Sequence, residues 1–310
     1  MEKHTKTPHI VVLMSAYNGA RFIREQIESI LRQEGVSVRL LVRDDGSSDA
    51  TRQILGNLQK VYPEIELVFD TNVGVSASFF RLLEKSGTGY DFYAFADQDD
   101  VWKPDKLIRA CKMLGSVDST APKMYYSRLE FVDENLRRLG YSAIPSTRGF
   151  HNALVQNQAT GCTIVMNRSA RNLVCQHLPE WTLMHDWWCY LVISAFGEVV
   201  YDEYPGILYR KHGNNVTPAT PNFAMELYAR TRRFLGKGDI PEKVTDQARQ
   251  FFSLYGDKLS AENRRLTQGF LKVREKGPIA RLVYALNMPV QRNTPLDNLI
   301  MRILIIAGRF

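Results

Sequence analysis

Residues 92–102 read FYAFADQDDVW, a run of apolar and aromatic side chains that ends in three carboxylates within four positions. The run over 92–96 predicts a buried strand, so the acids stand at its carboxyl end. Three neighbouring carboxylates repel one another unless a cation lies beside them, and oxygen-rich clusters suit Mg²⁺ or Mn²⁺. A solvated acidic turn is the plain alternative. The apolar strand, which delivers the acids from the core, favours metal binding.

The residues before this strand repeat a strand, a loop and an amphipathic segment. Strands are predicted over 10–14, 38–42 and 65–69, and apolar residues at helical spacing follow each of them. This rhythm is typical of βα units around a parallel sheet. Beyond residue 120 it loosens, with strands predicted over 124–127, 163–166, 199–201 and 207–209 and a helix over 186–196. We therefore expect an α/β fold with a mixed, mostly parallel sheet flanked by helices, and a helical C-terminal extension.

Polar clusters also follow the first two strands. Residues 15–19 read SAYNG and residues 44–49 read DDGSSD. Ligands of open α/β sheets bind at the carboxyl ends of the strands, so the three clusters should converge on one site. For residues 44–49 a capped turn with solvated acids is the alternative, because Asp and Ser favour such turns.

Taken together, residues 15–19, 43–49 (RDDGSSD), 72–74 (NVG) and 96–102 resemble the motifs of family 2 glycosyltransferases, which have the Rossmann-like GT-A fold. Spacing and order both fit. Residues 185–188 (HDWW) and 209–215 (YRKHGNN) are similar to the bacterial rhamnosyltransferase branch of cell-surface polysaccharide synthesis. The likeness covers about residues 8–216, and the catalytic domain is predicted over 1–220. The resemblance implies an inverting, metal-dependent transfer of a sugar from a nucleotide-sugar donor.

The resemblance also implies roles for the residues of these clusters. The base, the ribose and the neighbouring part of the donor would be held by Ser15, Ala16, Tyr17, Asp45 and Asp97. Asp99 matches the acid that binds Mn²⁺ or Mg²⁺, the ion that bridges the diphosphate of the donor. Asp100 is expected to support this site from behind.

Asp186 matches the family's catalytic base, which takes the proton from an acceptor hydroxyl. An acid that merely begins a helix is the alternative. Trp187 and Trp188 are candidates for contacts with the acceptor, and core packing is the alternative for both. His185 adjoins the base and is expected at most to orient it.

A basic loop that contains a histidine follows the strand predicted over 207–209. His212 is expected to ligate the metal or to contact the diphosphate, and the sequence does not separate the two roles. Arg210 and Lys211 are candidates for steadying the leaving diphosphate. A solvated turn is the alternative for this loop.

The resemblance implies dTDP-rhamnose as the donor and a polyprenyl-diphosphate-linked glycan as the acceptor. A UDP-hexose or UDP-N-acetylhexosamine donor stays open, because few polar contacts decide the sugar. A sugar nucleotidyltransferase and a non-catalytic sugar-binding module are alternatives from other classes. The nucleotidyltransferase would need a basic, glycine-rich loop after the first strand, and residues 15–19 offer no cation there.

Composition and charge bear on the partners. Apolar residues at 45% and charged residues at 24% are those of an ordinary folded protein, which excludes disorder and coiled coil. The net charge is +7, and residues 221–310 alone carry 16 basic and 8 acidic side chains, or +8. This basic, helical region could meet an anionic membrane surface. Nucleic acid is not expected as a partner, because no motif that reads bases is present.

The final helix is predicted after Pro295, with Leu296, Leu299 and Ile303 on one apolar stripe. Core packing and a membrane surface both suit this stripe. No stretch reaches the ~20 apolar residues of a spanning helix, and the first ten residues lack the apolar run of a secretory signal. Four separated cysteines without a CxxC pair indicate free thiols. We therefore expect a cytoplasmic enzyme that is peripheral at the inner face of the plasma membrane.

Overall fold

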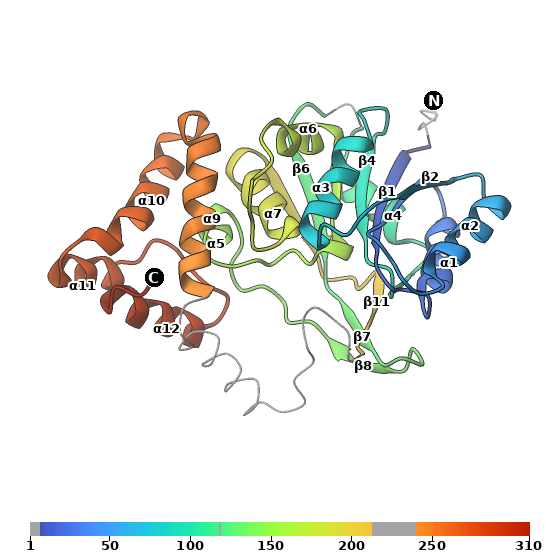
Figure 1. The fold of residues 1–310 in the computed structure, drawn as a ribbon. Helices are drawn as coiled ribbons and strands as arrows, with labels where there is room; N and C mark the ends of the chain where they lie inside the picture. Colours follow the sequence, from blue (N-terminus) through green and yellow to red (C-terminus); the bar gives the residue numbers. More distant parts are fainter. Residues whose placement is uncertain (1–6, 118, 213–239) are drawn as a thin grey trace.

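The computed structural model describes residues 7–117, 119–212 and 240–310. A seven-stranded sheet with the order β10-β6-β9-β4-β1-β2-β3 forms its centre, and helices lie on both faces (Figure 1). Neighbouring strands are parallel except at β9, which is antiparallel to β4 and β6. The strands are β1 (His9–Ala16), β2 (Ser37–Asp44), β3 (Ile65–Phe69), β4 (Phe92–Ala96), β6 (Lys123–Ser127), β9 (Val165–Asn167) and β10 (Glu198–Asp202). The expected α/β fold is confirmed.

The central strands are buried on both faces, which explains their continuous apolar sequence. Along β1, Val11 and Leu13 belong to one core cluster, whereas Val12 and Met14 belong to the cluster on the opposite face of the sheet. Side chains of a strand alternate between faces, so a single apolar run contributes to two cores.

Helices follow the first four strands in the predicted order. In the first half of the chain they are α1 (Ile23–Leu31), α2 (Thr51–Val61), α3 (Val75–Lys85) and α4 (Lys106–Leu114). Further along are α5 (Phe150–Ala153), a 3-10 turn over Gly161–Thr163, α6 (Arg168–Gln176) and α7 (His185–Phe196). Of these, α7 matches the helix predicted over 186–196, whereas α5 and α6 were not predicted. The strand predicted over 163–166 is therefore displaced: its first part is the 3-10 turn, and β9 begins at Val165.

A second, four-stranded sheet has the order β5-β11-β7-β8. Its strands are β5 (Val101–Trp102), β7 (Glu130–Val132), β8 (Arg138–Tyr141) and β11 (Ile207–Arg210), and only β11 was predicted. β5 directly follows the acids of residues 97–100 and pairs with β11. This pairing brings the end of β11, and the basic loop after it, beside the acid cluster.

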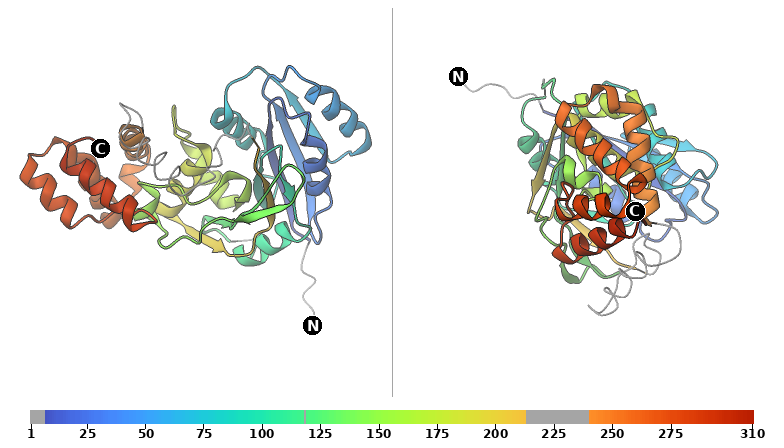
Figure 2. Two further views of the ribbon diagram at one scale, coloured as in Figure 1. Left: turned by 90° about the horizontal axis from the view of Figure 1, so that it is seen from below. Right: turned by 90° about the vertical axis from the view of Figure 1, so that its left-hand side faces the viewer.

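The C-terminal region is helical, as expected. It contains α9 (Ile240–Tyr255), α10 (Ala261–Lys272), α11 (Pro278–Leu286) and α12 (Pro295–Ile306), with 3-10 turns at Gly256–Lys258 and Val273–Glu275. Figure 2 shows these helices at one end of the elongated molecule, away from α2 and β3. Phe251 and Tyr255 of α9 belong to the same core cluster as Trp188 of α7. The predicted boundary at residue 220 lies outside the described residues and stays a prediction.

Two further expectations concern helices and thiols. Across residues 7–117, 119–212 and 240–310, no helix combines the length and the apolar character that crossing a membrane requires. All four cysteines are free; Cys111, Cys162 and Cys189 are buried and Cys175 is half-buried. The expectation of free, mostly buried thiols is confirmed.

Candidate active site

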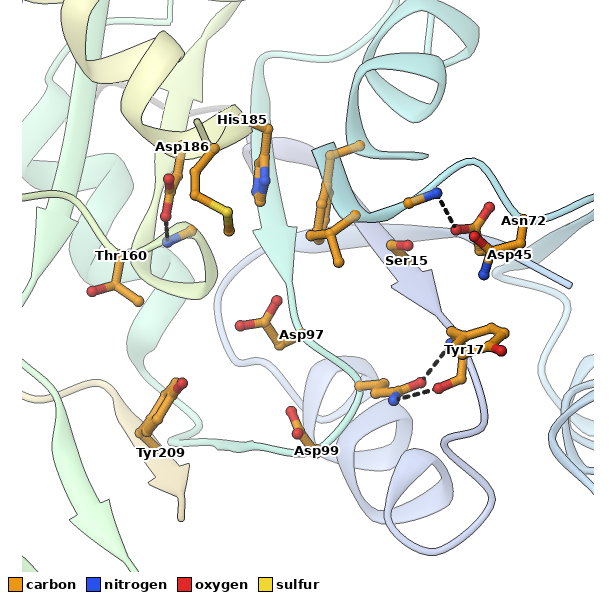
Figure 3. A pocket seen from close by; sticks show the side chains of 16 residues that line it. Ser15, Tyr17, Asp45, Asn72, Asp97, Asp99, Thr160, His185, Asp186 and Tyr209 are labelled. Atoms are coloured by element: carbon orange, nitrogen blue, oxygen red, sulfur yellow. Dashed lines mark hydrogen bonds between the residues drawn. The ribbon is translucent and has the colours of Figure 1, made fainter. Parts of the chain in front are cut away.

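A pocket of about 390 Å³ lies at the carboxyl ends of β1, β2 and β4 (Figure 3). Six of its lining residues were predicted to act in the site: Ser15, Tyr17, Asp45, Asp97, Asp99 and Asp186. The sequence assigned no role to nine others, among which are Asn72, Gln98, Thr160, Gly161 and Tyr209. The three polar clusters after the strands therefore converge, as expected for a sheet of this type.

The loop after β1 forms one wall of the pocket. The Gln98 amide accepts a hydrogen bond from the Tyr17 N–H at 2.9 Å and donates one to the Tyr17 carbonyl at 3.0 Å. These paired bonds fasten this loop to the acid cluster and leave the Tyr17 ring half exposed. Ser15 Oγ lies 2.6 Å from Ser78 Oγ on α3. Ala16 is fully buried and its carbonyl accepts from the Asp45 N–H, so contact between Ala16 and the donor stays a prediction that the described geometry does not support.

Asp45 follows β2 and is fixed by its surroundings. Its carboxylate accepts the N–H groups of Val73 and Gly74 at 2.9 and 3.0 Å, and it is ion-paired with the buried Arg43. Gly46 must be glycine: its φ is +86°, and an added Cβ would lie 2.9 Å from the Asn72 nitrogen. The tight turn thus holds Asp45 against residues 72–74 at the pocket wall. A capped turn with solvated acids would not explain these hydrogen bonds between Asp45 and residues 73–74.

The acid cluster divides into one group at the pocket and one group behind it. Burial, together with the charges of Asp99 and Asp186, raises the pKa of Asp97 to about 7. Asp97 and Asp99 both line the pocket, and Asp99 is less buried than Asp100. Asp100 is almost completely buried, and its Oδ1 accepts the Arg210 N–H at 3.1 Å. Asp100 therefore ties the acid cluster to β11, in line with the supporting role expected for it.

Asp99 and His212 are brought together although 113 residues separate them. His212 Nε2 and Asp99 Oδ2 share a hydrogen bond of 2.8 Å, and both side chains are largely buried. His212 is not among the residues that line the pocket, and it reaches the site through Asp99, which does line it. A carboxylate oxygen and an imidazole nitrogen are ligands that Mn²⁺ accepts, and Mg²⁺ accepts the carboxylate. The donor set therefore fits the predicted cation. Residues 213–215 of the same motif lie outside the described residues.

A neighbouring cluster fits such a cation less well. Asp97, Asp100 and Cys162 offer ligand atoms within 4.8 Å of one another. Burial raises the pKa of Cys162 well above its ordinary value, so the thiol keeps its proton. A protonated thiol is a poor ligand for Mg²⁺ or Mn²⁺, which prefer oxygen. Asp99 with His212 is the better candidate pair.

Asp186 begins α7 on the opposite side of the pocket (Figure 3). Its Oδ2 accepts the Gly161 N–H at 2.9 Å, and its Oδ1 accepts the Asn157 amide at 2.9 Å and the Trp187 N–H at 2.6 Å. Burial raises the pKa of Asp186 to about 6, although these three donors oppose the shift. The result is a carboxylate that is ionised at neutral pH, is fixed in direction and is poised to accept a proton.

His185 lines the same pocket without contacting the Asp186 carboxylate through a hydrogen bond. Its ring stacks on Phe79 with a centroid distance of 4.0 Å, and neither ring nitrogen has a partner among the described residues. Burial lowers the pKa of His185 to about 3, so the imidazole is neutral. The idea that His185 orients the base is not supported; Asn157 and Gly161, which the sequence did not single out, do so.

Two of the predicted contact residues, Trp188 and Arg210, need correction, and contact between Trp187 and an acceptor stays a prediction. Trp188 is fully buried in the core, where it packs against Phe251, so it cannot contact an acceptor. Trp187 is partly buried, and its indole N–H donates to the Ala153 carbonyl at 2.7 Å. Arg210 is also buried, and its guanidinium pairs with Glu25 and bonds the Asp99 carbonyl, so it supports the acid cluster and does not face the pocket. The sequence around Arg210 could not predict this ion pair, because its partner Glu25 lies on α1, far away in the chain.

Lys211 lies beside the second sheet, outside the pocket lining. Its ammonium group lies 3.8 Å from the centroid of the Phe131 ring of β7. Its backbone N–H donates to the Val132 carbonyl at 2.8 Å. Contact between Lys211 and a diphosphate therefore stays a prediction that the described geometry does not support.

Comparisons with known proteins show which family the chain resembles. Residues 11–172 match the family model described as glycosyl transferase family 2. The dTDP-rhamnosyl transferase RfbG of Shigella flexneri is 29% identical over 225 residues, which cover 68% of this chain and 75% of that protein. The succinoglycan biosynthesis protein ExoO of Rhizobium meliloti is 32% identical over 138 residues, which cover 43% of this chain and 37% of that protein.

Among solved structures, S. aureus TarS 1–349 in complex with UDP-GlcNAc matches with a TM-score of 0.54. The match covers 97% of this chain and 90% of TarS at 15% identity, so it concerns the fold alone. It confirms the GT-A fold that the resemblance implied. The family match spans more than half of the sequence and takes in the clusters after β1, β2 and β4. The chain accordingly belongs to glycosyl transferase family 2.

Proposed function

We propose that this glycosyltransferase moves rhamnose from dTDP-rhamnose to a hydroxyl of a lipid-linked glycan, with inversion and with Mn²⁺ or Mg²⁺, in bacterial cell-surface polysaccharide synthesis. One observation carries the proposal. The Asp186 carboxylate, held by three N–H donors, shares a pocket with Asp45, Asp97 and Asp99. A base and an acidic cluster that face one cavity suit a displacement between a donor and an acceptor.

The proposed reaction is a single displacement. The acceptor oxygen attacks the anomeric carbon and forms the new glycosidic bond, while the bond from that carbon to the diphosphate oxygen breaks. Asp186 takes the proton of the acceptor hydroxyl, and the nucleoside diphosphate leaves with the electron pair of the broken bond. One displacement inverts the configuration at the anomeric carbon.

The other side of the pocket suits the nucleotide. Ser15, Tyr17 and Asp45 stand at the carboxyl ends of β1 and β2, where α/β sheets bind such ligands. Asp99 and His212 would hold the cation, which when bound supplies positive charge to the diphosphate of the donor. We call the side formed by Ser15, Tyr17 and Asp45 the nucleotide wall. The two hydrogen bonds between Gln98 and Tyr17 hold this wall beside the candidate metal ligand Asp99.

The choice of donor rests on similarity. RfbG is named as a dTDP-rhamnosyl transferase and matches two thirds of this chain, and residues 185–188 follow the pattern of that branch. The second candidate is a UDP-hexose or UDP-N-acetylhexosamine, which is favoured by the fold shared with the UDP-GlcNAc complex of TarS. Family membership disfavours both a nucleotidyltransferase and a binding module. The acceptor would be a polyprenyl-diphosphate-linked glycan at the cytoplasmic face of the membrane.

The test is calorimetric titration with dTDP-rhamnose, dTDP, UDP-glucose and UDP-GlcNAc, each with and without Mn²⁺ or Mg²⁺. We expect metal-dependent binding that prefers the thymidine nucleotides. Preference for a UDP-sugar would overturn rhamnose as the sugar and leave the site and the mechanism in place. Absence of binding to every nucleotide would overturn the proposal as a whole.

A further inference from the structure

Helices α11 and α12 present an unusual number of large apolar side chains to solvent. Seventeen such side chains are exposed in the described residues, and eight of them lie on these two short helices. They are exposed by between 38% and 81%: Ile279, Leu282, Val283, Leu286, Leu296, Leu299, Ile303 and Ile306. We call this set the apolar face. Such a patch on a protein surface marks an interaction site.

Helical spacing places these residues together. On α11 the exposed positions 279, 282, 283 and 286 follow the i, i+3, i+4, i+7 pattern of one helix face. On α12 the exposed positions 296, 299, 303 and 306 recur at i, i+3, i+7 and i+10, which also places them on one helix face. The opposite sides of the helices hold the buried Ala285, Met301, Leu304 and Ile305, which join the protein core. Each helix is therefore apolar on both sides, although core packing needs only one of them.

Basic side chains border the apolar face at one end. Lys272, Arg274 and Lys276 precede α11, and Arg309 follows α12; all four are exposed. The two ends meet, because a Cβ added at Gly308 would lie 1.7 Å from Arg281 of α11. Residues 272–310 contain seven basic and two acidic side chains, a net charge of +5. An apolar face with a cationic border is the combination that binds anionic lipid surfaces.

The loop between the two helices is hydrogen-bonded to residues 151–156, which precede Asn157 in the chain. The Gln291 N–H donates to the His151 carbonyl, the Asn152 amide donates to the Gln291 carbonyl, and the Asn293 N–H donates to Gln156 Oε1. The next residue, Asn157, donates to Asp186. The apolar face and the catalytic base are thus joined through one continuous segment, residues 151–157.

We infer that the apolar face of α11 and α12 rests on a lipid bilayer with anionic headgroups. The face would lie at the boundary between headgroups and acyl chains, with the cationic border against the lipid phosphates. A second copy of the chain is the competing occupant. It would bring an equally positive border to the contact, whereas anionic lipid neutralises that border.

This inference deepens the proposed function, because it states where a lipid-linked acceptor is met. It can nevertheless fail independently. Binding to vesicles is measured without donor, metal or acceptor, and nucleotide binding is measured without lipid. If vesicle binding is absent, the nucleotide measurement is unaffected, and the reverse also holds.

The experiment is flotation of the full chain with phosphatidylcholine vesicles, with and without 30% phosphatidylglycerol, in low and high salt. The test variant combines Leu286→Ser with Ile303→Ser, and the control combines Leu139→Ser with Val61→Ser, which are exposed to a similar extent on β8 and α2. A charge variant combines Lys276→Glu with Arg309→Glu. Thermal unfolding and light scattering confirm that each variant is folded and report its oligomeric state.

We expect wild type and control to float with the anionic vesicles, and the Leu286→Ser, Ile303→Ser variant to bind at least ~10-fold more weakly. Each removed cation should weaken binding by about fivefold in low salt. The inference is overturned if wild type does not bind, or if the test variant binds as well as the control. It is equally overturned if wild type is a dimer that the test variant disrupts and neither binds vesicles.

Discussion

The side-chain amide of Asn157 donates a 2.9 Å hydrogen bond to Asp186 Oδ1 and so joins the loop before the 3-10 turn to the start of α7. This bond favours the ionised form of the carboxylate, which is the form a general base needs. The sequence offered no reason to select Asn157. Its role depends on a contact between residues 29 positions apart, which only the fold creates.

Replacement of Asn157 by alanine should therefore raise the pKa of Asp186. A rise of about one unit would lower kcat/KM about fivefold at pH 6 and leave it nearly unchanged at pH 8, since the base is then ionised in either protein. The measurement is the pH profile of transfer. Asn57→Ala, at an exposed position of α2, is the control. A uniform loss at every pH would indicate a merely structural role for Asn157.

The substitution Asp186→Asn should separate chemistry from donor binding. Loss of a general base lowers the rate by ~10²–10⁴-fold, while the nucleotide side of the pocket is untouched. Calorimetry with the nucleotide and a transfer assay, run on the same preparation, check both parts. Normal turnover would remove Asp186 from the mechanism.

The wild-type enzyme should lose activity as the pH falls through about 6. The cause is burial, which raises the pKa of Asp186 to about 6, so the protonated and inactive form accumulates below that value. Three titratable groups surround Asp186: Asp97, Cys189 and His185. The charge of Asp186 contributes to the raised pKa of Asp97. Cys189 lies one turn further along α7, and His185 stays neutral. A plateau of kcat/KM that continues to pH 5 would contradict the assignment.

The substitution Gly161→Ala should disturb the base without touching the nucleotide wall. The added Cβ would lie 3.0 Å from His185 Nε2 and 3.5 Å from Asp186 Oδ2. We expect kcat to fall by roughly tenfold, in the range of a weakened hydrogen bond to a charged group, with unchanged affinity for the nucleotide. Gly56→Ala on α2 meets no atom within 4 Å and should be neutral or slightly stabilising. Equal behaviour of the two variants would argue against tight packing at Gly161.

Removal of either candidate metal ligand should abolish the effect of the cation. For Asp99→Asn and for His212→Ala we expect affinity for the nucleoside diphosphate in Mn²⁺ to fall to the level measured without metal. Asp257→Asn, a fully exposed carboxylate, serves as the control. Unchanged dependence on Mn²⁺ in both variants would place the cation elsewhere, with Asp97, Asp100 and Cys162 as the next group to test.

Much of the central fold followed from sequence, because long apolar runs such as 10–14 and 92–96 can be satisfied only in a buried strand. The acids at their carboxyl ends followed from the same rule. The second sheet did not: β5 has two residues and β7 has three, too few for a periodic pattern. Trp188 and Arg210 were assigned to contacts in the site, yet both are buried, because burial depends on partners such as Phe251 and Glu25 elsewhere in the chain.

The pairing of β5 with β11 has a consequence for stability. Asp99 and His212 meet only while the small second sheet is formed, whereas the nucleotide wall belongs to the large sheet. A ligand that binds only the folded form stabilises it by mass action. Cation binding would therefore protect the second sheet against local unfolding. Backbone hydrogen exchange at residues 207–210 should slow when the metal site is occupied.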